Sequence, residues 1–215
     1  MTILLFGASG FIGKAVLNQL ISMHVEKIIC VRQTLSGTEP FQGDGVEWHA
    51  LDILAPDTMK LANFVEISDI VLNCTGELEN TLTMTEINFH FVKRLTALLK
   101  ASTKSHHFIQ LSSVGCYGAV NFYRGQAKSI TEDATERPAG LYETSKTQAD
   151  DYIREQISEQ TPNVSYTIIR PTNVFGKGMN SQALVGLSNI IKAGRFFYIG
   201  NQASISTYII HMNVS

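Results

Sequence analysis

The sequence predicts an α/β protein built on a doubly wound parallel sheet, followed by the start of a small C-terminal lobe. Two observations support this fold class. Short runs of apolar and β-branched residues alternate with longer segments whose apolar residues recur at helical spacing, which is the pattern of βαβ units. A length of 215 residues, 44% of them hydrophobic and 17% charged, fits a good-sized domain with a core of its own.

The first third of the chain contains four compact apolar runs, which predict strands buried on both faces. They are Thr2–Phe6, Lys27–Val31, Val46–His49 and Ile70–Cys74. From Phe11 to about Met23 the apolar residues recur at helical spacing, which predicts a helix after the first strand. A shorter helix is expected at Thr58–Phe64.

The rest of the chain continues this alternation. The expected helices are Glu86–Ala101, Leu141–Ile157 and Ala183–Ala193, and the expected strands are Phe108–Leu111, Val164–Ile169 and two short runs, FFYIG and TYIIH. We interpret RPTNVFGKG as a glycine-rich turn. The composition changes near Gly176–Gly178, so we expect a main domain at residues 1–176 and the beginning of a second lobe at residues 177–215.

Charge and cysteine content exclude several classes of protein. The formal charge of −2 offers no broad basic surface, so we expect neither nucleic acid nor a membrane as a partner. No apolar run approaches the length of a membrane helix, and the N-terminus lacks the basic flank of a signal peptide. Cys30, Cys74 and Cys116 form no CxxC pair, which argues against a disulfide framework or a metal site. These features favour a cytoplasmic protein.

A glycine-rich turn, GASGFIG, separates the first strand from the first helix. Gly7, Gly10 and Gly13 would let the backbone approach a pyrophosphate, and the helix N-terminus would present free N–H groups to that anion. The spacing is a variant of the dinucleotide fingerprint, and the flanking strand and helix are the context that the fingerprint requires. The turn therefore predicts a Rossmann-type dinucleotide-binding domain, unless the glycines serve only a tight turn.

The end of the second strand indicates which dinucleotide is bound. An acidic residue there would bind the ribose 2′-hydroxyl, whereas this chain has Arg32, which suits a 2′-phosphate. This favours NADP(H) over NAD(H), although Arg32 could instead stack on adenine or face solvent. Asp52 comes after the third strand, where it could meet the adenine amino group or cap the next turn.

Tyr142 and Lys146, in YETSK, are four residues apart and so share one face of the predicted helix. A neighbouring ammonium would favour the phenolate and lower the pKa of the tyrosine, which would make it useful for proton transfer at neutral pH. Ser112 and Ser113 lie at the end of a predicted strand, where a hydroxyl could donate a hydrogen bond to a substrate oxygen. Hydride exchange with a nicotinamide would complete the chemistry.

In this order, GASGFIG, SSVGCYG, YETSK and IRPTNVFGKG resemble the motifs of the extended short-chain dehydrogenase/reductase family, in particular its NAD(P)-dependent nucleotide-sugar epimerase/dehydratase branch. The resemblance covers essentially the whole chain. It implies that Tyr142 is the acid/base, that Lys146 is its electrostatic partner and a ligand of the nicotinamide ribose, and that Ser113, rather than Ser112, is the catalytic hydroxyl.

The resemblance also implies roles for other residues. Asn88 would help to organise the catalytic site, and Asn173, like Ser113, would contact the substrate. The cofactor contacts expected on this basis are Gly7, Ser9, Gly10, Phe11, Ile12, Gly13, Arg32, Asp52, Ile53, Thr75, Tyr142 and Lys146.

The two residues directly after Ser113 limit which reactions of the branch are expected. Dehydratases of the branch have Asp and Glu there, whereas this chain has Val114 and Gly115, so a dehydratase is not expected. A 4-epimerase and a 4-keto reductase acting on a nucleotide sugar both remain open, with Arg32 favouring the reductase. The alternatives are an NADPH-dependent reductase of small ketones and a non-catalytic dinucleotide-sensing regulator, and the latter would not need Tyr142.

Two features depart from the pattern of this branch. Ser206–Thr207 stand where epimerase relatives have an arginine, and family members usually continue well beyond this length. The resemblance therefore implies either a fragment with a truncated lobe or a degenerate relative. Relatives also dimerise through two long helices, so Glu86–Ala101 and Leu141–Ile157 could form a homodimer interface. Phe91 and Leu141 are extra apolar residues on these helices, which would either join that interface or pack within one subunit.

Overall fold

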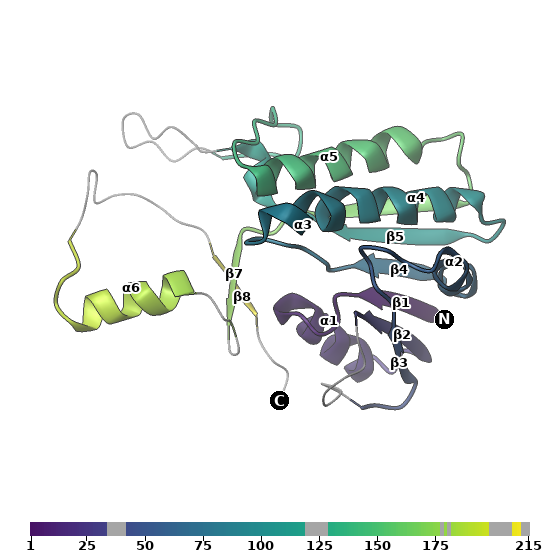
Figure 1. Ribbon diagram of the computed structural model, residues 1–215, viewed down its shortest axis with the longest axis horizontal. Helices are drawn as coiled ribbons and strands as arrows, with labels where there is room; N and C mark the ends of the chain where they lie inside the picture. The colour runs from purple at the N-terminus through teal and green to yellow at the C-terminus, as the bar shows by residue number, and fades with distance from the viewer. Residues whose placement is uncertain (34–41, 119–128, 177–178, 180–181, 198–207, 212–215) are drawn as a thin grey trace.

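The structure is a computed structural model that describes residues 1–33, 42–118, 129–176, 179, 182–197 and 208–211. Its main body is a parallel sheet of six strands in the order β3-β2-β1-β4-β5-β6 (Figure 1). The strands are β1 (Thr2–Phe6), β2 (Lys27–Arg32), β3 (Val46–Ala50), β4 (Ile70–Asn73), β5 (His106–Leu111) and β6 (Val164–Ile169). The strand order reverses between β1 and β4, which places a ligand crevice beyond their carboxyl ends.

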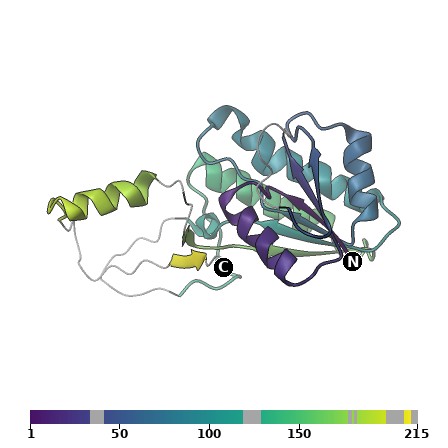
Figure 2. The ribbon, with the colours of Figure 1, turned by 90° about the horizontal axis from the view of Figure 1, so that it is seen from below.

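Helices cover both faces of the sheet (Figures 1 and 2), so the predicted doubly wound fold is confirmed. Helix α1 (Phe11–Ser22) lies on one face, and α2 (Thr58–Ile67), α4 (Phe91–Ala101) and α5 (Leu141–Gln156) lie on the other. Alternate residues of each central strand supply the two cores: Leu5 packs with the α1 side and Leu4 with the other. Burial on both faces explains why these strands are continuous apolar runs.

The helix predicted at Glu86–Ala101 begins earlier, at Thr81, and contains an irregular turn. Its parts are α3 (Thr81–Thr85), a π-helical turn (Glu86–His90) and α4. The early start has a local cause, because the Asn80 side chain accepts a hydrogen bond of 3.0 Å from the Leu82 amide and so caps the helix. The π turn places Asn88 in the protein interior, and such turns are frequent at functional sites.

Phe91 belongs to the core of one chain, which is the second of the two possibilities that the sequence leaves open for it. It is fully buried and packs edge-on against Phe6 of β1, with the ring centroids 5.0 Å apart. The extra apolar residue on α4 therefore serves the core of one chain. Leu141, at the start of α5, is exposed.

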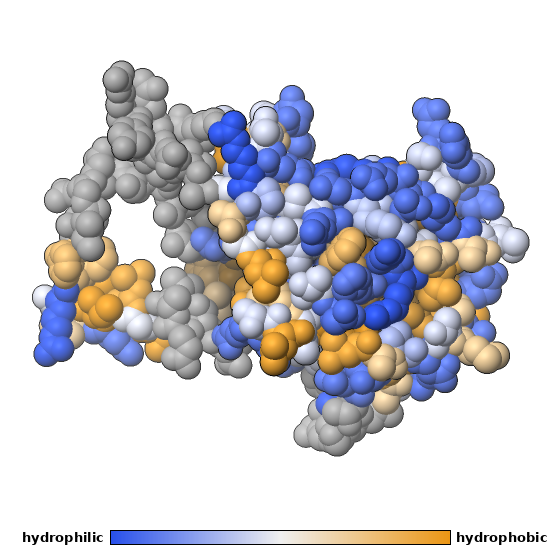
Figure 3. Space-filling view, turned by 45° about the horizontal axis from the view of Figure 1, so that its top comes forward, coloured by the Kyte–Doolittle hydropathy of each residue, from blue (hydrophilic) through white to orange (hydrophobic). Residues whose placement is uncertain are grey.

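The C-terminal part stands beside the main body (Figures 1 and 2). The segment RPTNVFGKG is wrongly interpreted as a turn, because Asn173–Gly176 form strand β7, which pairs in parallel with β8 (Tyr208–His211). Within FFYIG, Phe196 and Phe197 are not in a strand, and residues 198–200 lie outside the described residues, as do Ser206 and Thr207. Helix α6 (Gln182–Lys192) exposes Val185, Ile190 and Ile191, and Figure 3 shows this apolar surface.

Across the described ranges, no helix is long and apolar enough to cross a membrane. The three cysteines are all free thiols.

Candidate active site

The turn after β1 has room only for glycine at two positions. Gly7 has a φ of +78°, and a Cβ there would lie 2.8 Å from the carbonyl carbon of Cys74, after β4. A Cβ on Gly13, in the first turn of α1, would overlap the carbonyl oxygen of Gly7. The glycines therefore let β1, β4 and α1 meet at the switch point of the sheet.

The N-terminus of α1 is suited to an anion. Its N-cap is Gly10, which provides no side-chain cap, so the first N–H groups of this 12-residue helix are left for another partner. The positive end of the helix dipole lies at the same place. Together with the close backbone approach at Gly7 and Gly13, this fits the pyrophosphate of a dinucleotide.

A cavity of about 640 Å³ opens beyond this turn. It is formed by the start of α1, the ends of β4 and β5, the first turn of α5, and β7. Its lining includes Gly10, Phe11, Ile12, Gly13, Thr75, Ser113, Tyr142, Lys146 and Asn173. The structure thus brings together the predicted catalytic serine, tyrosine and lysine, the predicted substrate asparagine and the glycine-rich turn, although these residues are far apart in the sequence.

Lys146 is held by two backbone carbonyls. Its ammonium donates hydrogen bonds of 2.9 Å to Thr75 O and 3.0 Å to Leu111 O, at the ends of β4 and β5. Burial lowers the pKa of Lys146 to about 8, while the nearby charge of Asp150 opposes this shift. Because an ammonium has three hydrogens, one donor remains for a ligand in the cavity.

The Tyr142 hydroxyl does not show the lowered pKa that the sequence predicts. Burial raises the pKa of Tyr142, and the charge of Glu143 adds to this, while a hydrogen bond with Ser113 opposes it. The Lys146 ammonium donates its hydrogen bonds to the carbonyls of Thr75 and Leu111. Tyr142 is therefore a protonated phenol at neutral pH, paired with Ser113.

Ser113 and Ser112 have different surroundings. Ser113 lines the cavity and begins the 3-10 turn Val114–Tyr117, where its hydroxyl accepts a hydrogen bond of 3.1 Å from Gly115 N. Ser112 is buried, and its hydroxyl donates a hydrogen bond of 2.7 Å to Asp150. Both serines line the cavity, but the Ser112 hydroxyl is bound to Asp150, and the role of Ser113 as the reactive hydroxyl stays a prediction.

Asp150 belongs to a buried charged network that the sequence motifs did not reveal. Arg170, after β6, donates a hydrogen bond of 3.0 Å from Nε to the Asp150 carboxylate and one of 2.9 Å to the Tyr117 hydroxyl. Asp150 lies four residues after Lys146 on α5, so this spacing is the signal that could have identified it. The network holds the side of α5 that faces away from the cavity. The negative charge of Asp150 partly offsets the lowering of the Lys146 pKa by burial.

Asn88 joins the loop after β4 to α5. Its side-chain oxygen accepts from Glu77 N at 2.9 Å, and its amide donates to Glu77 O at 3.0 Å and to Ser145 Oγ at 3.1 Å. All of these bonds are within the protein, so Asn88 positions the loop that carries Thr75 and Gly76. The organising role expected for Asn88 at the catalytic site stays a prediction.

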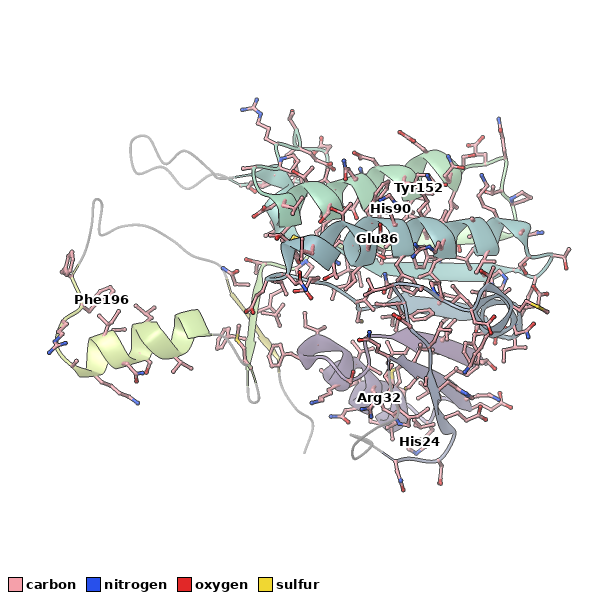
Figure 4. All side chains as sticks on the ribbon, in the orientation of Figure 1. His24, Arg32, Glu86, His90, Tyr152 and Phe196 are labelled. Carbon is pink, nitrogen blue, oxygen red and sulfur yellow. The ribbon has the colours of Figure 1, made fainter. Side chains whose placement is uncertain are left out.

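The remaining predicted cofactor residues are more dispersed. Ser9 is exposed in the glycine turn and Arg32 ends β2 (Figure 4), while Ile53 is half-buried against the core. Asp52 is exposed, and its carboxylate accepts a hydrogen bond of 2.9 Å from Leu54 N, so it caps its own turn. Asp52, Arg32, Ser9 and Ile53 do not line the cavity described above.

Glu143 is a cavity residue that the sequence motifs did not single out. The feature of the sequence that could have identified Glu143 is its position directly after Tyr142, within YETSK.

The chain is similar to known proteins in sequence and in fold. A profile of the NAD dependent epimerase/dehydratase family matches residues 3–202. A 4-epimerase of N-acetyl-α-D-glucosaminyl-diphospho-ditrans,octacis-undecaprenol from Escherichia coli O157:H7 is 28% identical over 92% of this chain and 56% of its own length. A decarboxylating sterol-4-α-carboxylate 3-dehydrogenase from Saccharomyces cerevisiae is 22% identical over 100% of this chain and 62% of its own length. The chain thus spans less than two thirds of these relatives.

Solved structures share the fold. The UDP-glucose 4-epimerase of Thermotoga maritima, solved with UDP-glucose, has a TM-score of 0.73 at 18% identity, over 98% of this chain and 70% of that one. A UDP-glucuronic acid 4-epimerase from Bacillus cereus, solved with NAD, has a TM-score of 0.66 at 20% identity, over 82% of this chain and 57% of that one. At these identities the likeness is one of fold.

Proposed function

Because the chain belongs to the NAD dependent epimerase/dehydratase family, we propose that it binds a nicotinamide dinucleotide and interconverts alcohol and ketone at C4 of the sugar of a nucleotide sugar, as a 4-epimerase or a 4-keto reductase. The observation that carries this proposal is the single cavity shared by the uncapped start of α1 and the side chains of Ser113, Tyr142 and Lys146.

The three side chains have complementary roles in this reaction. The Tyr142 phenol exchanges a proton with the sugar oxygen, and Ser113 hydrogen-bonds both to the phenol and to that oxygen. Lys146 supplies a positive charge and a donor to the floor of the cavity. A bound nicotinamide supplies the hydride acceptor and donor. Val114 and Gly115 provide no acid or base next to Ser113, so we do not propose a dehydration.

The names of the relatives favour C4 of a diphosphate-linked sugar. The Escherichia coli relative is named as a 4-epimerase of a lipid diphosphate sugar, and the similar Thermotoga maritima structure is a UDP-glucose 4-epimerase. The sterol dehydrogenase relative supports a second candidate, a dehydrogenase or reductase of small ketones without a nucleotide. Turnover of a UDP-sugar but not of a sterol-like or small ketone would select the first candidate.

For the cofactor, we propose that NADP(H) is preferred over NAD(H). Arg32 at the end of β2 supports this preference, whereas several solved structures of the same fold are complexes with NAD. Calorimetric titration of the chain with NADP⁺ and with NAD⁺ tests the preference directly. Tighter binding of NAD⁺ would contradict it, and binding of neither would contradict the proposed function as a whole.

Tyr142→Phe tests the catalytic role. The variant should lose at least 100-fold in turnover of UDP-sugars, since general acid–base catalysis typically contributes about 10²–10⁴, while its dinucleotide affinity should stay within about twofold. Tyr152→Phe is the matched control, because Tyr152 lies on the same helix and packs against Phe89 outside the cavity. Full retention of turnover by Tyr142→Phe would favour a non-catalytic dinucleotide sensor.

Three further aspects are proposed with this function. Residues 1–176 form the dinucleotide-binding domain in this proposal, and residues 177–215 form the beginning of a substrate lobe. The pairing of β7 with β8 links the two.

The second aspect is a homodimer through α4 and α5, which is supported by the exposed Leu141. The elution volume of the protein in size-exclusion chromatography tests this oligomeric state.

The third aspect is a reducing, cytoplasmic setting, which is supported by the three free thiols.

A further inference from the structure

Glu143 brings a carboxylate into the candidate active site. It comes directly after Tyr142 in the first turn of α5 and lines the same cavity as Ser113 and Tyr142. The side chain is half-buried. Within the described part of the chain, its carboxylate makes no hydrogen bond and no ion pair with another residue.

Two glycines leave the space that Glu143 occupies. A Cβ at Gly115 would lie 2.9 Å from Cγ of Glu143, and a Cβ at Gly140 would overlap its Oε2 atom. Gly115 lies in the turn after Ser113, and Gly140 is the N-cap of α5. The Glu143 side chain is therefore enclosed between the two elements that carry the reactive hydroxyls, and larger residues on either element would displace it.

The negative charge of Glu143 has no cation opposite it among the described cavity residues. The other charged residue of the lining is Lys146, and its ammonium is bound to the carbonyls of Thr75 and Leu111. The charge of Glu143 is felt at the phenol, whose pKa it raises. An acceptor of this kind calls for ligand groups that donate hydrogen bonds and carry no negative charge.

We propose that Glu143 is a specificity-determining residue, whose carboxylate accepts hydrogen bonds from hydroxyl or amide groups of the bound sugar and disfavours sugars that carry a carboxylate. This inference rests on the proposed function. It assigns the substrate to the neutral or amide-bearing nucleotide sugars rather than to the uronic acids. Solved structures of the same fold include a UDP-glucose 4-epimerase with UDP-glucose and a UDP-glucuronic acid 4-epimerase with an analogue of UDP-glucuronic acid, so enzymes of this fold are named for either class of sugar.

UDP-glucose and UDP-glucuronate are matched probes, because they differ only at C6 of the sugar. Their dissociation constants would be measured by calorimetry with the dinucleotide present. Wild-type protein should bind UDP-glucose more tightly. Glu143→Gln keeps the shape and removes the charge. It should lower the ratio of the dissociation constant of UDP-glucuronate to that of UDP-glucose about tenfold, mainly because UDP-glucuronate binds more tightly. Glu143→Asp keeps the charge and should keep the discrimination.

Glu155→Gln is the matched control, because it makes the same change at an exposed position of the same helix and should leave the ratio unchanged. Unchanged dinucleotide affinity in Glu143→Gln shows that the dinucleotide site of the variant is intact. If the ratio then equals that of wild-type protein, or if wild-type protein binds UDP-glucuronate at least as tightly, Glu143 does not set the specificity. Binding of neither sugar nucleotide by wild-type protein would overturn the proposed function, and this inference with it.

Discussion

At the scale of single residues, Gly13 shows how the site depends on a missing side chain. Any Cβ at this position would overlap the carbonyl oxygen of Gly7, so α1 would have to move away from the turn after β1. The N–H groups at the start of α1 would move with it. A substitution of Gly13 should therefore affect both the stability of the protein and its affinity for the dinucleotide.

We expect Gly13→Ala to lower the free energy of unfolding by about 1–3 kcal/mol, the usual cost of overpacking, and to weaken dinucleotide binding at least tenfold. Urea unfolding and calorimetry measure the two effects. Gly186→Ala, in α6, is the control, because a Cβ there meets no atom within 4 Å. It should be neutral or stabilising by about 0.5–1 kcal/mol. Equal effects of the two substitutions would argue against a packed turn.

At the scale of elements, Asn88 connects three of them: the loop after β4, the π turn and α5. Asn88→Ala should lower the free energy of unfolding by about 2–3 kcal/mol, because it leaves the amide and carbonyl of Glu77 without their partner. Hydrogen exchange of residues 76–80 should accelerate. Asn189→Ala, at an exposed position of α6, should change neither quantity. Unchanged exchange in Asn88→Ala would show that the loop is held by other contacts.

The same elements show what the sequence can predict. The central strands are recognisable because burial on both faces makes them continuous apolar runs, and the four motifs mark the strand ends and the start of α5 where the site assembles. The π turn is not recognisable, because one extra residue within a helix barely changes the apolar spacing. Strand β7 is hidden by the proline and glycines around it, and its pairing partner β8 is distant in the sequence. The raised pKa of Tyr142 depends on burial, which only the assembled fold defines.

At the scale of the whole molecule, the buried titratable groups determine how stability responds to alkaline pH. Burial raises the pKa of Cys30 and Cys74 to about 12 and that of Cys116 to about 11, from an ordinary value of 9.0. Between pH 9 and 11 the folded protein therefore keeps thiol protons that the unfolded chain releases, so stability falls as pH rises. Lys146 acts in the opposite direction, because its pKa is lowered to about 8 and the unfolded chain then binds the extra proton.

Three thiols outweigh one lysine, because a group whose protonation differs fully between the two states contributes about 1.4 kcal/mol per pH unit. The unfolded thiols are only half ionised at pH 9, so we expect the free energy of unfolding, measured with urea, to fall by about 2 kcal/mol per pH unit between pH 9 and 10.5. Cys30→Ala should reduce this slope by about 1 kcal/mol per pH unit, since one thiol is removed. Ile29→Val changes the neighbouring core residue without removing a thiol, so its slope should match that of wild-type protein. An unchanged slope in Cys30→Ala would contradict the raised pKa of this thiol in the folded protein, because linkage requires a pKa that differs between the two states.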